Sequence, residues 1–340
     1  MDKQSINRKH YIAIVLALIA GVAVLLFTHQ RKRYWADAGM VWNTEYHMNY
    51  ETKVHLTDSI QAVLNSIDMS ASPYNANSLI TRVNNNQAEV LDEILRKLYL
   101  TSVDINKASE GAYDPTVMPL VNAWGFGYKK GQLPTDEQID SILQFVGISK
   151  TQLNGQRLIK EDPRIQLDFS SIAKGLACDE MGRMFERAGA SNYMIEIGGE
   201  VLAHGVNSRG TDWHISIDLP LDEDSTVNHQ SALVVAITDE AVATSGNYRK
   251  FKMINGQKVS HIIDPLTGRS CTSNLLSVTI IANDCMTADA WATACMVMGL
   301  ERVQRMMKER TDLGVMTISS DDNGNYVVWS NQQFANHVIQ

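Results

Sequence analysis

Residues His261–Gly268 read HIIDPLTG, and the chain continues through the apolar run SVTIIA at 277–282 to MTADAWATACMVMG at 286–299. The short run rich in β-branched residues predicts a buried strand. In the last stretch apolar residues recur at helical spacing, which predicts a helix over 286–299. Asp289 and Thr293 interrupt this apolar pattern four positions apart, so both project from one face of the helix.

A carboxylate and a hydroxyl on one face of an apolar helix have two explanations. In the first, the Thr293 hydroxyl bonds back to the carbonyl of Asp289, whose carboxylate is favoured near the helix start. In the second, both oxygens bind a hard cation. Mg²⁺ takes such ligands, with waters and substrate phosphates completing its coordination. The spacing alone leaves both explanations open.

Length and charge limit the classes of protein that the chain can belong to. It has 340 residues and a formal net charge of −8, which suits one large or two modest domains with a real core. Beyond the N-terminus there is no long basic run, repeat or low-complexity tract. An acidic chain without a basic stripe argues against nucleic acid as a partner.

The N-terminus carries an uncharged, almost entirely apolar segment at residues 11–27, with basic residues on both sides. It is at the short end for a spanning helix and long for the core of a signal peptide. No small-residue cleavage site follows, so we expect an uncleaved membrane anchor, with a cleaved signal as the alternative. The flanking charges leave its orientation open. The expected parts are a tail at 1–10, the anchor at 11–27, a juxtamembrane linker at 28–40 and a folded domain at 41–340.

The cysteines do not form a metal-binding pattern. They stand at positions 178, 271, 285 and 295 without a CxxC pair, which argues against a zinc site. Cys178 and Cys295 fall in apolar helical patterns and are expected to be buried thiols. A disulfide between Cys271 and Cys285 is an alternative in an oxidising compartment.

Strands and helices mix along the chain without regular βαβ alternation, which predicts an α+β fold with mixed or antiparallel sheets flanked by helices. The expected elements are a strand at 41–54, helices at 57–67, 88–108 and 135–145, a hairpin at Asn154-Gly155, a strand, turn and helix from Leu167, a strand with a Gly-Gly break from Tyr193, further strands within 212–283, a helix at 300–310 and a hairpin at 322–324.

The stretch LDFSSIAKG, residues 167–175, reads as a buried strand delivering Asp168, a turn at 170–171 and a helix start. Lys174 lies in the first turn, where a cation opposes the helix dipole, so we expect it to face an anion such as phosphate. A surface lysine after a capping serine is the alternative. Neither the Walker A spacing nor GxGxxG occurs.

A further stretch carries side chains that suit a ligand site. GAYDPTVMPLVNAWGFG, from Gly111, lacks a period and is too apolar for an exposed loop, so it folds onto the core or a ligand. Asp114 could accept from a ribose or base; the aromatic residues Tyr113, Trp124 and Phe126 offer flat surfaces or form a small aromatic core.

His261 is the candidate base. A histidine can take a proton from an attacking hydroxyl near neutral pH, although a lone histidine can equally bond a backbone carbonyl. A serine hydrolase is disfavoured because the GxSxG elbow is absent.

Together these segments resemble, in order and spacing, the ApbE family of FAD:protein FMN transferases. The resemblance spans about Trp42 to Gly299 and rests on SPYNANS, GAYDPTVMPLVNAWGFG, LDFSSIAKGLACD, YMIEIGGEV, ATSGNYR, SHIIDPLTG and ADAWATACMVMG. It implies an ApbE-like fold and a Mg²⁺-dependent enzyme that splits FAD. The enzyme would move FMN onto a Ser or Thr hydroxyl of a target protein through a phosphoester bond and release AMP.

The resemblance also implies partners and a location. The acceptors would include subunits of sodium-pumping quinone reductases (Nqr) and Rnf-type electron-transport complexes. The catalytic domain would face the periplasm from an anchor in the bacterial inner membrane. Two alternatives remain at this point: a Mg²⁺-dependent FAD pyrophosphatase that uses water as acceptor, and an anchored flavin-binding protein without turnover.

Residue roles carry over by position. Asp289 and Thr293 resemble the metal ligands, with a backbone oxygen from the turn at Ser171, and His261 resembles the base that activates the acceptor hydroxyl. The positions that resemble FAD contacts are Trp42, Tyr74, Ala112, Tyr113, Asp114, Asp168, Lys174 and Ile263.

The chain departs from the family pattern at three places. Trp42-Asn43-Thr44 stands where the family has Met-Gly-Thr, so the close backbone approach that glycine allows is lost. Ala292 occupies a position where some members carry another acidic residue beside the metal threonine, so the site would depend more on Asp289. The lipobox cysteine of lipoprotein members is absent, which agrees with the anchor.

Overall fold

The structure, a computed structural model, describes residues 10–19, 21, 32–127, 133–220, 231–247, 251–254 and 257–339. It confirms the α+β class, because helices flank sheets whose described strand pairs are all antiparallel.

The main sheet has eight strands in the order β1-β2-β5-β6-β9-β12-β13-β14. Their bounds are β1 (Arg33–Val41), β2 (Thr44–Thr52), β5 (Tyr193–Ile197), β6 (Glu200–His204), β9 (Glu240–Gly246), β12 (Leu275–Ala282), β13 (Gly314–Ser320) and β14 (Tyr326–Ser330). The central strand β12 is buried along almost its whole length, as expected for a strand covered on both faces.

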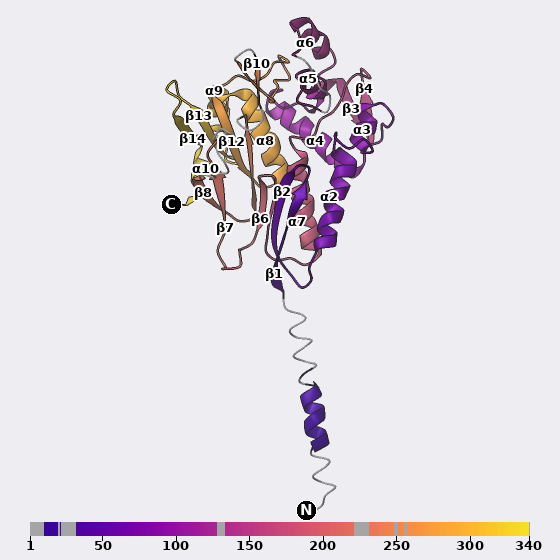
Figure 1. Cartoon of the computed structure of the whole chain (residues 1–340), viewed down its shortest axis with the longest axis vertical. Helices are drawn as coiled ribbons and strands as arrows, with labels where there is room; N and C mark the ends of the chain where they lie inside the picture. The colour runs from indigo at the N-terminus through magenta and orange to yellow at the C-terminus, as the bar shows by residue number, and fades with distance from the viewer. Residues whose placement is uncertain are drawn as a thin grey trace, which may run out of the picture.

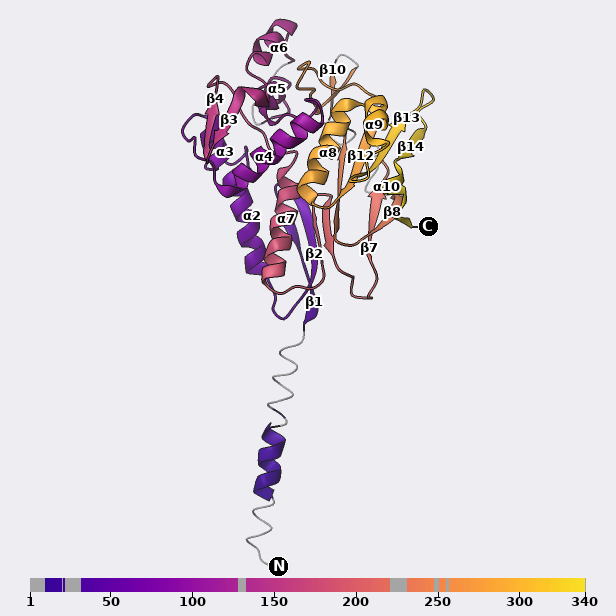
Figure 2. The ribbon, with the colours of Figure 1, turned by 180° about the vertical axis from the view of Figure 1, so that it is seen from behind.

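Helices cover one face of this sheet and form the larger core with it (Figure 1). They are α2 (Thr57–Ala71), α4 (Glu93–Ala108), α7 (Ala173–Arg187), α8 (Cys285–Met298) and α9 (Leu300–Met307). Seen from behind, α8 packs beside α7 (Figure 2). Helix α8 is apolar on nearly every side, and its Trp291 is among the largest fully buried side chains. A helix of this kind is buried between other elements.

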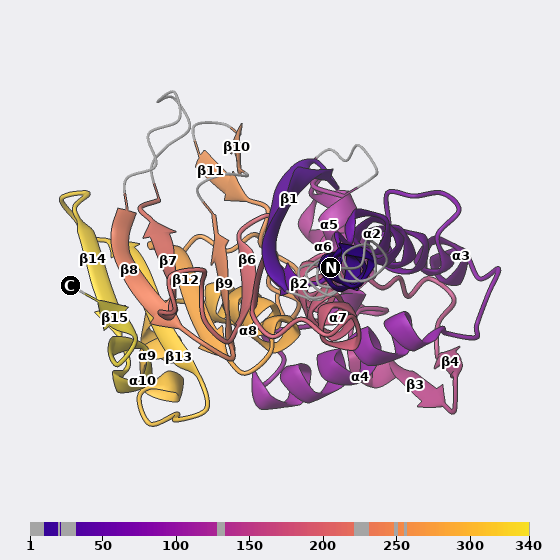
Figure 3. The same cartoon turned by 90° about the horizontal axis from the view of Figure 1, so that it is seen from below.

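A three-stranded sheet covers the opposite face at one end of the molecule (Figure 3). Its strands are β7 (Trp213–Asp218), β8 (Ser231–Ile237) and β15 (Val338–Ile339), in the order β15-β8-β7. Trp213 and Val235 of this sheet share a core cluster with Val242 and Ile281 of the main sheet. The main sheet therefore has an apolar layer on each side.

The remaining elements are short. They are α3 (Leu79–Asn84), η1 (Pro115–Val117), α5 (Met118–Ala123), α6 (Asp136–Leu143), η2 (Ile148–Lys150), β3 (Thr151–Asn154), β4 (Arg157–Lys160), β10 (Phe251–Ile254), β11 (Gln257–Ser260) and α10 (Gln332–Ala335). Three of them, η1, α5 and α6, contribute to a third, smaller apolar cluster. The predicted hairpin at Asn154-Gly155 joins β3 to β4 and is confirmed.

The N-terminal boundary of the folded part differs from the prediction. Residues 41–54 do not form one strand, because the chain turns at Trp42-Asn43 between β1 and β2. From Arg33 onward, the segment expected as a linker at 28–40 is β1. The prediction failed because polar and apolar residues alternate only weakly in an edge strand that is exposed on one side.

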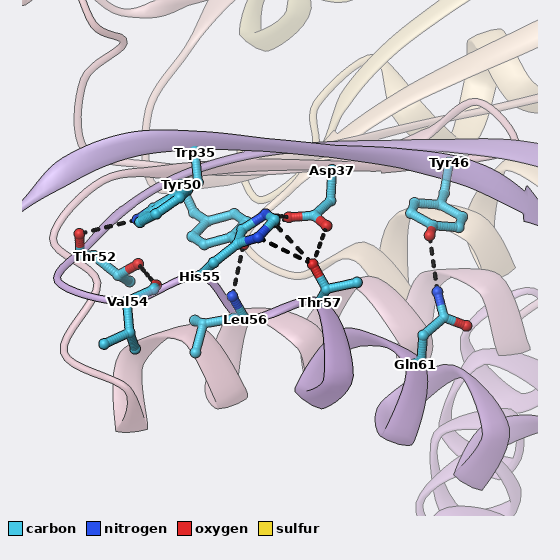
Figure 4. Close-up of polar contacts among 10 residues, drawn as sticks. All are labelled: Trp35, Asp37, Tyr46, Tyr50, Thr52, Val54, His55, Leu56, Thr57 and Gln61. Atoms are coloured by element: carbon cyan, nitrogen blue, oxygen red, sulfur yellow. Dashed lines mark hydrogen bonds and ion pairs between the residues drawn. The ribbon is translucent and has the colours of Figure 1, made fainter.

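Polar contacts attach this hairpin to α2 (Figure 4). Asp37 on β1 accepts hydrogen bonds from the hydroxyls of Tyr50, at 2.6 Å, and Thr57, at 2.7 Å. Its Oδ2 also lies 2.8 Å from Nε2 of His55, whose ring stacks on Trp35 with centroids 4.6 Å apart. The edge strand β1 is therefore an integral part of the folded domain.

The prediction of a strand at Leu167–Asp168 is also wrong. This segment is extended but pairs with no neighbouring strand. The Asn84 side chain accepts from Leu167 N and donates to Leu167 O, both at 2.8 Å, and Asp168 N donates to Pro115 O. Buried backbone groups must be hydrogen-bonded, and here a side chain takes the place of a strand. The helix start after this segment is confirmed in α7.

The break predicted within the strand from Tyr193 is a tight hairpin. Gly198 and Gly199 join β5 to β6 with φ of +62° and +96°. Glycine adopts this left-handed backbone without the steric cost that a Cβ brings. The turn places Glu200 at the first position of β6.

Within the part of the chain that the structure describes, no helix is both long and apolar enough to cross a membrane. Residues 10–19 are helical and exposed, and residues 20 and 22–27 of the predicted anchor at 11–27 lie outside the described residues. The four cysteines are free, which contradicts a disulfide between Cys271 and Cys285; Cys178 and Cys295 are buried, as predicted.

Candidate active site

Helix α8 forms as predicted and carries Asp289 and Thr293. Asp289 is only 3% exposed. The Thr293 hydroxyl lies 3.2 Å from that of Ser245 on β9, a contact across to the sheet rather than back along the helix. Both side chains of the predicted metal pair therefore sit on a buried helix, with the hydroxyl supported by the neighbouring strand.

Helix α7 reaches the Asp289 carboxylate with a backbone group. Gly175 N–H donates to Asp289 Oδ2 at 3.1 Å. A Cβ on Gly175 would lie 2.4 Å from the carbonyl oxygen of Cys285, so only glycine permits this approach of the two helices. The position is thus required by packing at the site.

A second buried carboxylate and one ammonium group complete the charged part of the site. Lys174 Nζ lies 2.5 Å from Glu200 Oε2, and Glu200 is 2% exposed. Burial would lower the pKa of Lys174, but Glu200 and Asp289 outweigh it and raise this pKa. Burial raises the pKa of Glu200 and of Asp289, and Lys174 opposes both shifts. Two carboxylates thus share one neighbouring cation.

This charge balance fits a cation. An isolated buried carboxylate is costly unless it is paired or coordinates a metal, and Lys174 balances only one of the two. Asp289 and Thr293 offer oxygen ligands, which hard cations prefer. In the described residues, no three His, Cys, Asp or Glu side chains gather as a metal cluster. An ion here would depend on Asp289, hydroxyl and backbone oxygens, and substrate phosphates.

Tyr113 lies beside this site but is not an open stacking surface. It is 2% exposed and belongs to the main core. The Ser171 hydroxyl donates to its phenol oxygen over 3.4 Å. Burial is the main cause that raises the pKa of Tyr113. The structure therefore links Tyr113 to the turn at Ser171, and its ring serves the core.

Asp114 and Ala112 also have structural roles, as a helix cap and a buried residue. The Asp114 carboxylate accepts from Thr116 N at 2.8 Å and from Ile148 N at 2.9 Å, and so caps η1. Ala112 is 1% exposed. Burial raises the pKa of Asp114, and these hydrogen bonds oppose the shift. Contact of this segment with FAD remains a prediction, and side-chain contact from Asp114 would compete with its capping role.

Tyr74 and Asp168 interact electrostatically. Burial and the charge of Asp168 both raise the pKa of the Tyr74 phenol, yet 67% of this residue is exposed. Asp168 accepts from Ser170 N at 2.8 Å, and burial raises its pKa. The tyrosine ring is therefore available on the surface near the turn that precedes α7.

His261 follows β11 and stands beside Phe126, with ring centroids 6.3 Å apart in an edge-on arrangement. The HIIDPLTG turn after it is closed by a bond from Gly268 N to Asp264 O, and Trp124 Nε1 donates to Gly268 O at 2.8 Å. The aromatic residues of the loop from Gly111 thus contact the histidine segment: Trp124 bonds to its turn and Phe126 packs beside His261.

Two other predicted cofactor contacts lie in different settings. Ile263 is buried in the small cluster with Leu120 and Ile139. Trp42 stands at the tip of the β1–β2 hairpin with φ of +48°, and Asn43 follows with +60°. A positive φ is uncommon for tryptophan, and such strain often marks functional sites. Asparagine tolerates this conformation better than most residues.

The sequence reasoning missed three residues of the site: Gly175, Asp179 and Glu200. All three lie in segments that were recognised, AKGLACD and YMIEIGGEV. A charged residue inside an apolar stretch was the available signal for Asp179 and Glu200. Their partners are more than twenty residues away in sequence, so no spacing rule indicated them.

The chain is similar to known proteins of one family. A model of the ApbE family matches residues 40–317. FAD:protein FMN transferase of Escherichia coli K12 is 34% identical over 293 residues, covering 84% of this chain and 82% of that protein. The Haemophilus influenzae protein of the same name is 35% identical over 314 residues, covering 87% and 89%.

Solved structures show the same fold. The flavin transferase ApbE from Vibrio cholerae superimposes with a TM-score of 0.79 at 31% identity, covering 90% of this chain and 99% of that one. The apo form of Pseudomonas stutzeri flavinyl transferase ApbE gives a TM-score of 0.80 at 28% identity, covering 90% and 97%.

Proposed function

The chain belongs to the ApbE family, and from this premise we propose that the site around Asp289 transfers FMN from FAD to a hydroxyl of a target protein with the help of Mg²⁺. The products are a protein carrying FMN on Ser or Thr through a phosphoester bond, and AMP. The observation that carries the proposal is the group of Asp289, Glu200 and Lys174. Its two buried carboxylates face a single ammonium group, so one further positive charge would balance them when both are ionised.

Asp289 and Thr293 would hold the metal, with a backbone oxygen from the turn at Ser171. An ion held there would supply positive charge for the phosphoryl transfer. Gly175 N–H fixes one carboxylate oxygen of Asp289, which leaves the other oxygen for the ion. Ser245 orients the Thr293 hydroxyl in the same way. The chain thus positions both ligands before substrate arrives.

Lys174 acts through the carboxylates rather than as a free phosphate ligand. Its ammonium group is paired with Glu200 and lies near Asp289. Its charge opposes the rise that burial causes in the pKa of both carboxylates and so favours the ionised form that a metal ligand requires. We therefore assign it to the electrostatics of the metal site, a narrower role than direct contact with FAD.

His261 is the proposed base. It would take the proton from the acceptor hydroxyl as the oxygen attacks the FMN phosphorus, and AMP leaves with the electron pair of the broken P–O bond. Trp124 bonds to the turn that follows the histidine, and Phe126 packs edge-on against the His261 ring. Tyr74, exposed beside Asp168, offers a surface on which an FAD ring could stack.

The apolar segment at 11–27 supports a further part of the proposal. It would anchor the protein in the bacterial inner membrane with the domain in the periplasm, where membrane-bound Nqr or Rnf-type subunits would be acceptors. A tether confines enzyme and acceptor to one surface and so raises their encounter rate.

The experiment that tests the function uses the full chain in detergent with FAD, Mg²⁺ and a candidate acceptor domain carrying a Ser/Thr flavinylation site. The acceptor's intact mass is measured with and without EDTA. A gain of one FMN unit, lost with EDTA, supports the transferase and its metal. Free FMN and AMP without a mass gain would support the pyrophosphatase with water as acceptor.

A further inference from the structure

Asp179 joins α7 to the start of α8, the helix that carries the proposed metal ligands. It is 6% exposed. Its two carboxylate oxygens accept from Cys285 N at 2.8 Å and Met286 N at 3.0 Å, the first two residues of α8. A buried carboxylate that accepts two backbone amides ties the end of one helix to the side of another.

The first turn of α8 also has its own cap. The Asp284 side chain accepts from Thr287 N at 2.8 Å and from the Thr287 hydroxyl at 2.9 Å. One such cap is what a helix start normally has. A second, buried carboxylate at the same end is costly, because two negative charges then lie together. The additional carboxylate therefore needs a reason beyond helix capping.

The geometry of the two helices supplies that reason. On α7, Gly175 and Asp179 are four positions apart and lie on one face. On α8, Cys285 and Asp289 are likewise four apart. Asp179 bonds to Cys285 while Gly175 bonds to Asp289, so two hydrogen bonds one helical turn apart connect the helices.

Two such contacts determine both the position of α8 along its axis and its rotation about that axis, relative to α7. The close approach at Gly175 leaves no room for a side chain between the helices. Without Asp179, the first turn of α8 keeps the Asp284 cap but loses its tie to α7, and within the described residues the bond from Gly175 N then holds the Asp289 carboxylate. A small shift at this point moves the carboxylate away from the other ligands.

We propose that Asp179 is a positioning residue for Asp289: by holding the first two amides of α8, it sets the carboxylate in the place where it binds the divalent cation. This inference rests on the proposed function, because the cation is part of it. Asp179 itself contacts neither metal nor substrate in this role.

The test measures binding of Mn²⁺ alone to the full chain in detergent by the EPR signal of the free ion, for the wild type, Asp179→Asn and Asp289→Ala. In Asp179→Asn one of the two acceptor oxygens is replaced by an NH₂ group that faces a helix amide, so one of the two hydrogen bonds is lost at almost constant volume. We expect Mn²⁺ affinity to fall about 10-fold, the size typical for partners of metal ligands. FAD binding in EDTA, followed by flavin fluorescence, should stay within about twofold of wild type because Asp179 does not contact FAD.

Asp92→Ala is the matched control. Asp92 caps α4, accepting from Leu95 N and the Ser70 hydroxyl, both at 2.8 Å. Its loss should lower the melting temperature in EDTA at least as much as Asp179→Asn does, while leaving Mn²⁺ affinity unchanged. If Asp179→Asn does not fold, Asp179→Ser, which keeps one acceptor oxygen, is measured against the same criteria.

The outcomes separate the two proposals. No Mn²⁺ binding by the wild type, or binding that survives in Asp289→Ala, would remove the metal assignment and the role of Asp179 with it. Binding that requires Asp289 but is unchanged in Asp179→Asn would overturn the positioning role alone. An equal loss in Asp92→Ala would also overturn it, because the effect would then reflect general stability.

Discussion

The backbone N–H of Gly175 and the Oδ2 atom of Asp289 are 3.1 Å apart, although 114 residues separate them in the sequence. This contact places the start of α7 against a buried carboxylate in the middle of α8. It brings the segments LDFSSIAKG and MTADAWATACMVMG into one site.

Asp289→Ala should lower the rate of FMN transfer on the order of 100-fold or more, because metal charge stabilisation of a phosphoryl transfer is worth several kcal/mol. Flavin incorporation into the acceptor is measured across a Mg²⁺ titration. Asp312→Ala, at an exposed residue paired with Arg310, is the control and should be unaffected. A Mg²⁺ response in Asp289→Ala equal to that of wild type would exclude Asp289 as the ligand.

Lys174→Met should lower the free energy of unfolding by about 3–5 kcal/mol, since it leaves Glu200 buried without its partner. Chemical denaturation followed by circular dichroism measures it. Lys97→Met breaks the more exposed pair with Glu180 and should cost less than about 1 kcal/mol. An equal loss of unfolding free energy in the two variants would show that the Lys174–Glu200 pair stabilises the fold no more than the exposed pair does.

His261→Ala should reduce kcat by about 10²- to 10⁴-fold, the range for loss of a general base. FAD binding, followed by fluorescence in EDTA, should change little, because the ring is assigned to the acceptor hydroxyl. Phe126→Leu, which removes the ring beside His261, should have a smaller effect on kcat. Lost FAD binding with normal residual turnover would move His261 from base to cofactor contact.

His337 should make the stability of the C-terminal segment depend on pH. Its hydrogen bond to Glu240, at 2.8 Å, raises its pKa above the usual 6.5. The folded state then binds a proton more tightly than the unfolded chain, so the stabilisation is complete below 6.5. It is lost as pH rises through the folded pKa. His337→Gln should therefore cost more at pH 5.5 than at pH 8.5, by roughly 1 kcal/mol or less, as measured by thermal unfolding. A cost independent of pH would contradict this.

Deletion of residues 1–31 should leave a folded enzyme that is no longer retained by membranes, because β1 begins at Arg33 and stays intact. Fractionation and the transfer assay measure both properties. A cut after Val41 removes β1 and the Asp37 contacts to Tyr50 and Thr57, and should lose stability. Membrane retention of the first fragment would contradict an anchor at 11–27.

Residue patterns within a few positions of one another predicted many of the helices and turns of this protein. The apolar period with Asp289 and Thr293 predicted α8, because a 3.6-residue repeat is a property of the helix itself. The turn signal at Asn154-Gly155 predicted a hairpin for the same kind of reason. The order of the motifs was enough to indicate the family.

Local chemistry failed where the partner of a group is distant in sequence. The expected strand at Asp168 is a coil because the Asn84 side chain satisfies the Leu167 backbone. Tyr113, expected as a possible platform for a ring ligand, is packed in the core.

The sequence by itself therefore determined most of the elements, the family and the candidate residues for a cation site. The tertiary structure alone decided that Glu200 pairs with Lys174, and that Asp179 and Gly175 hold α8. The physical reason is that propensity and periodicity act within a few residues. Burial, charge balance and close helix approach depend on groups that only the folded chain brings together.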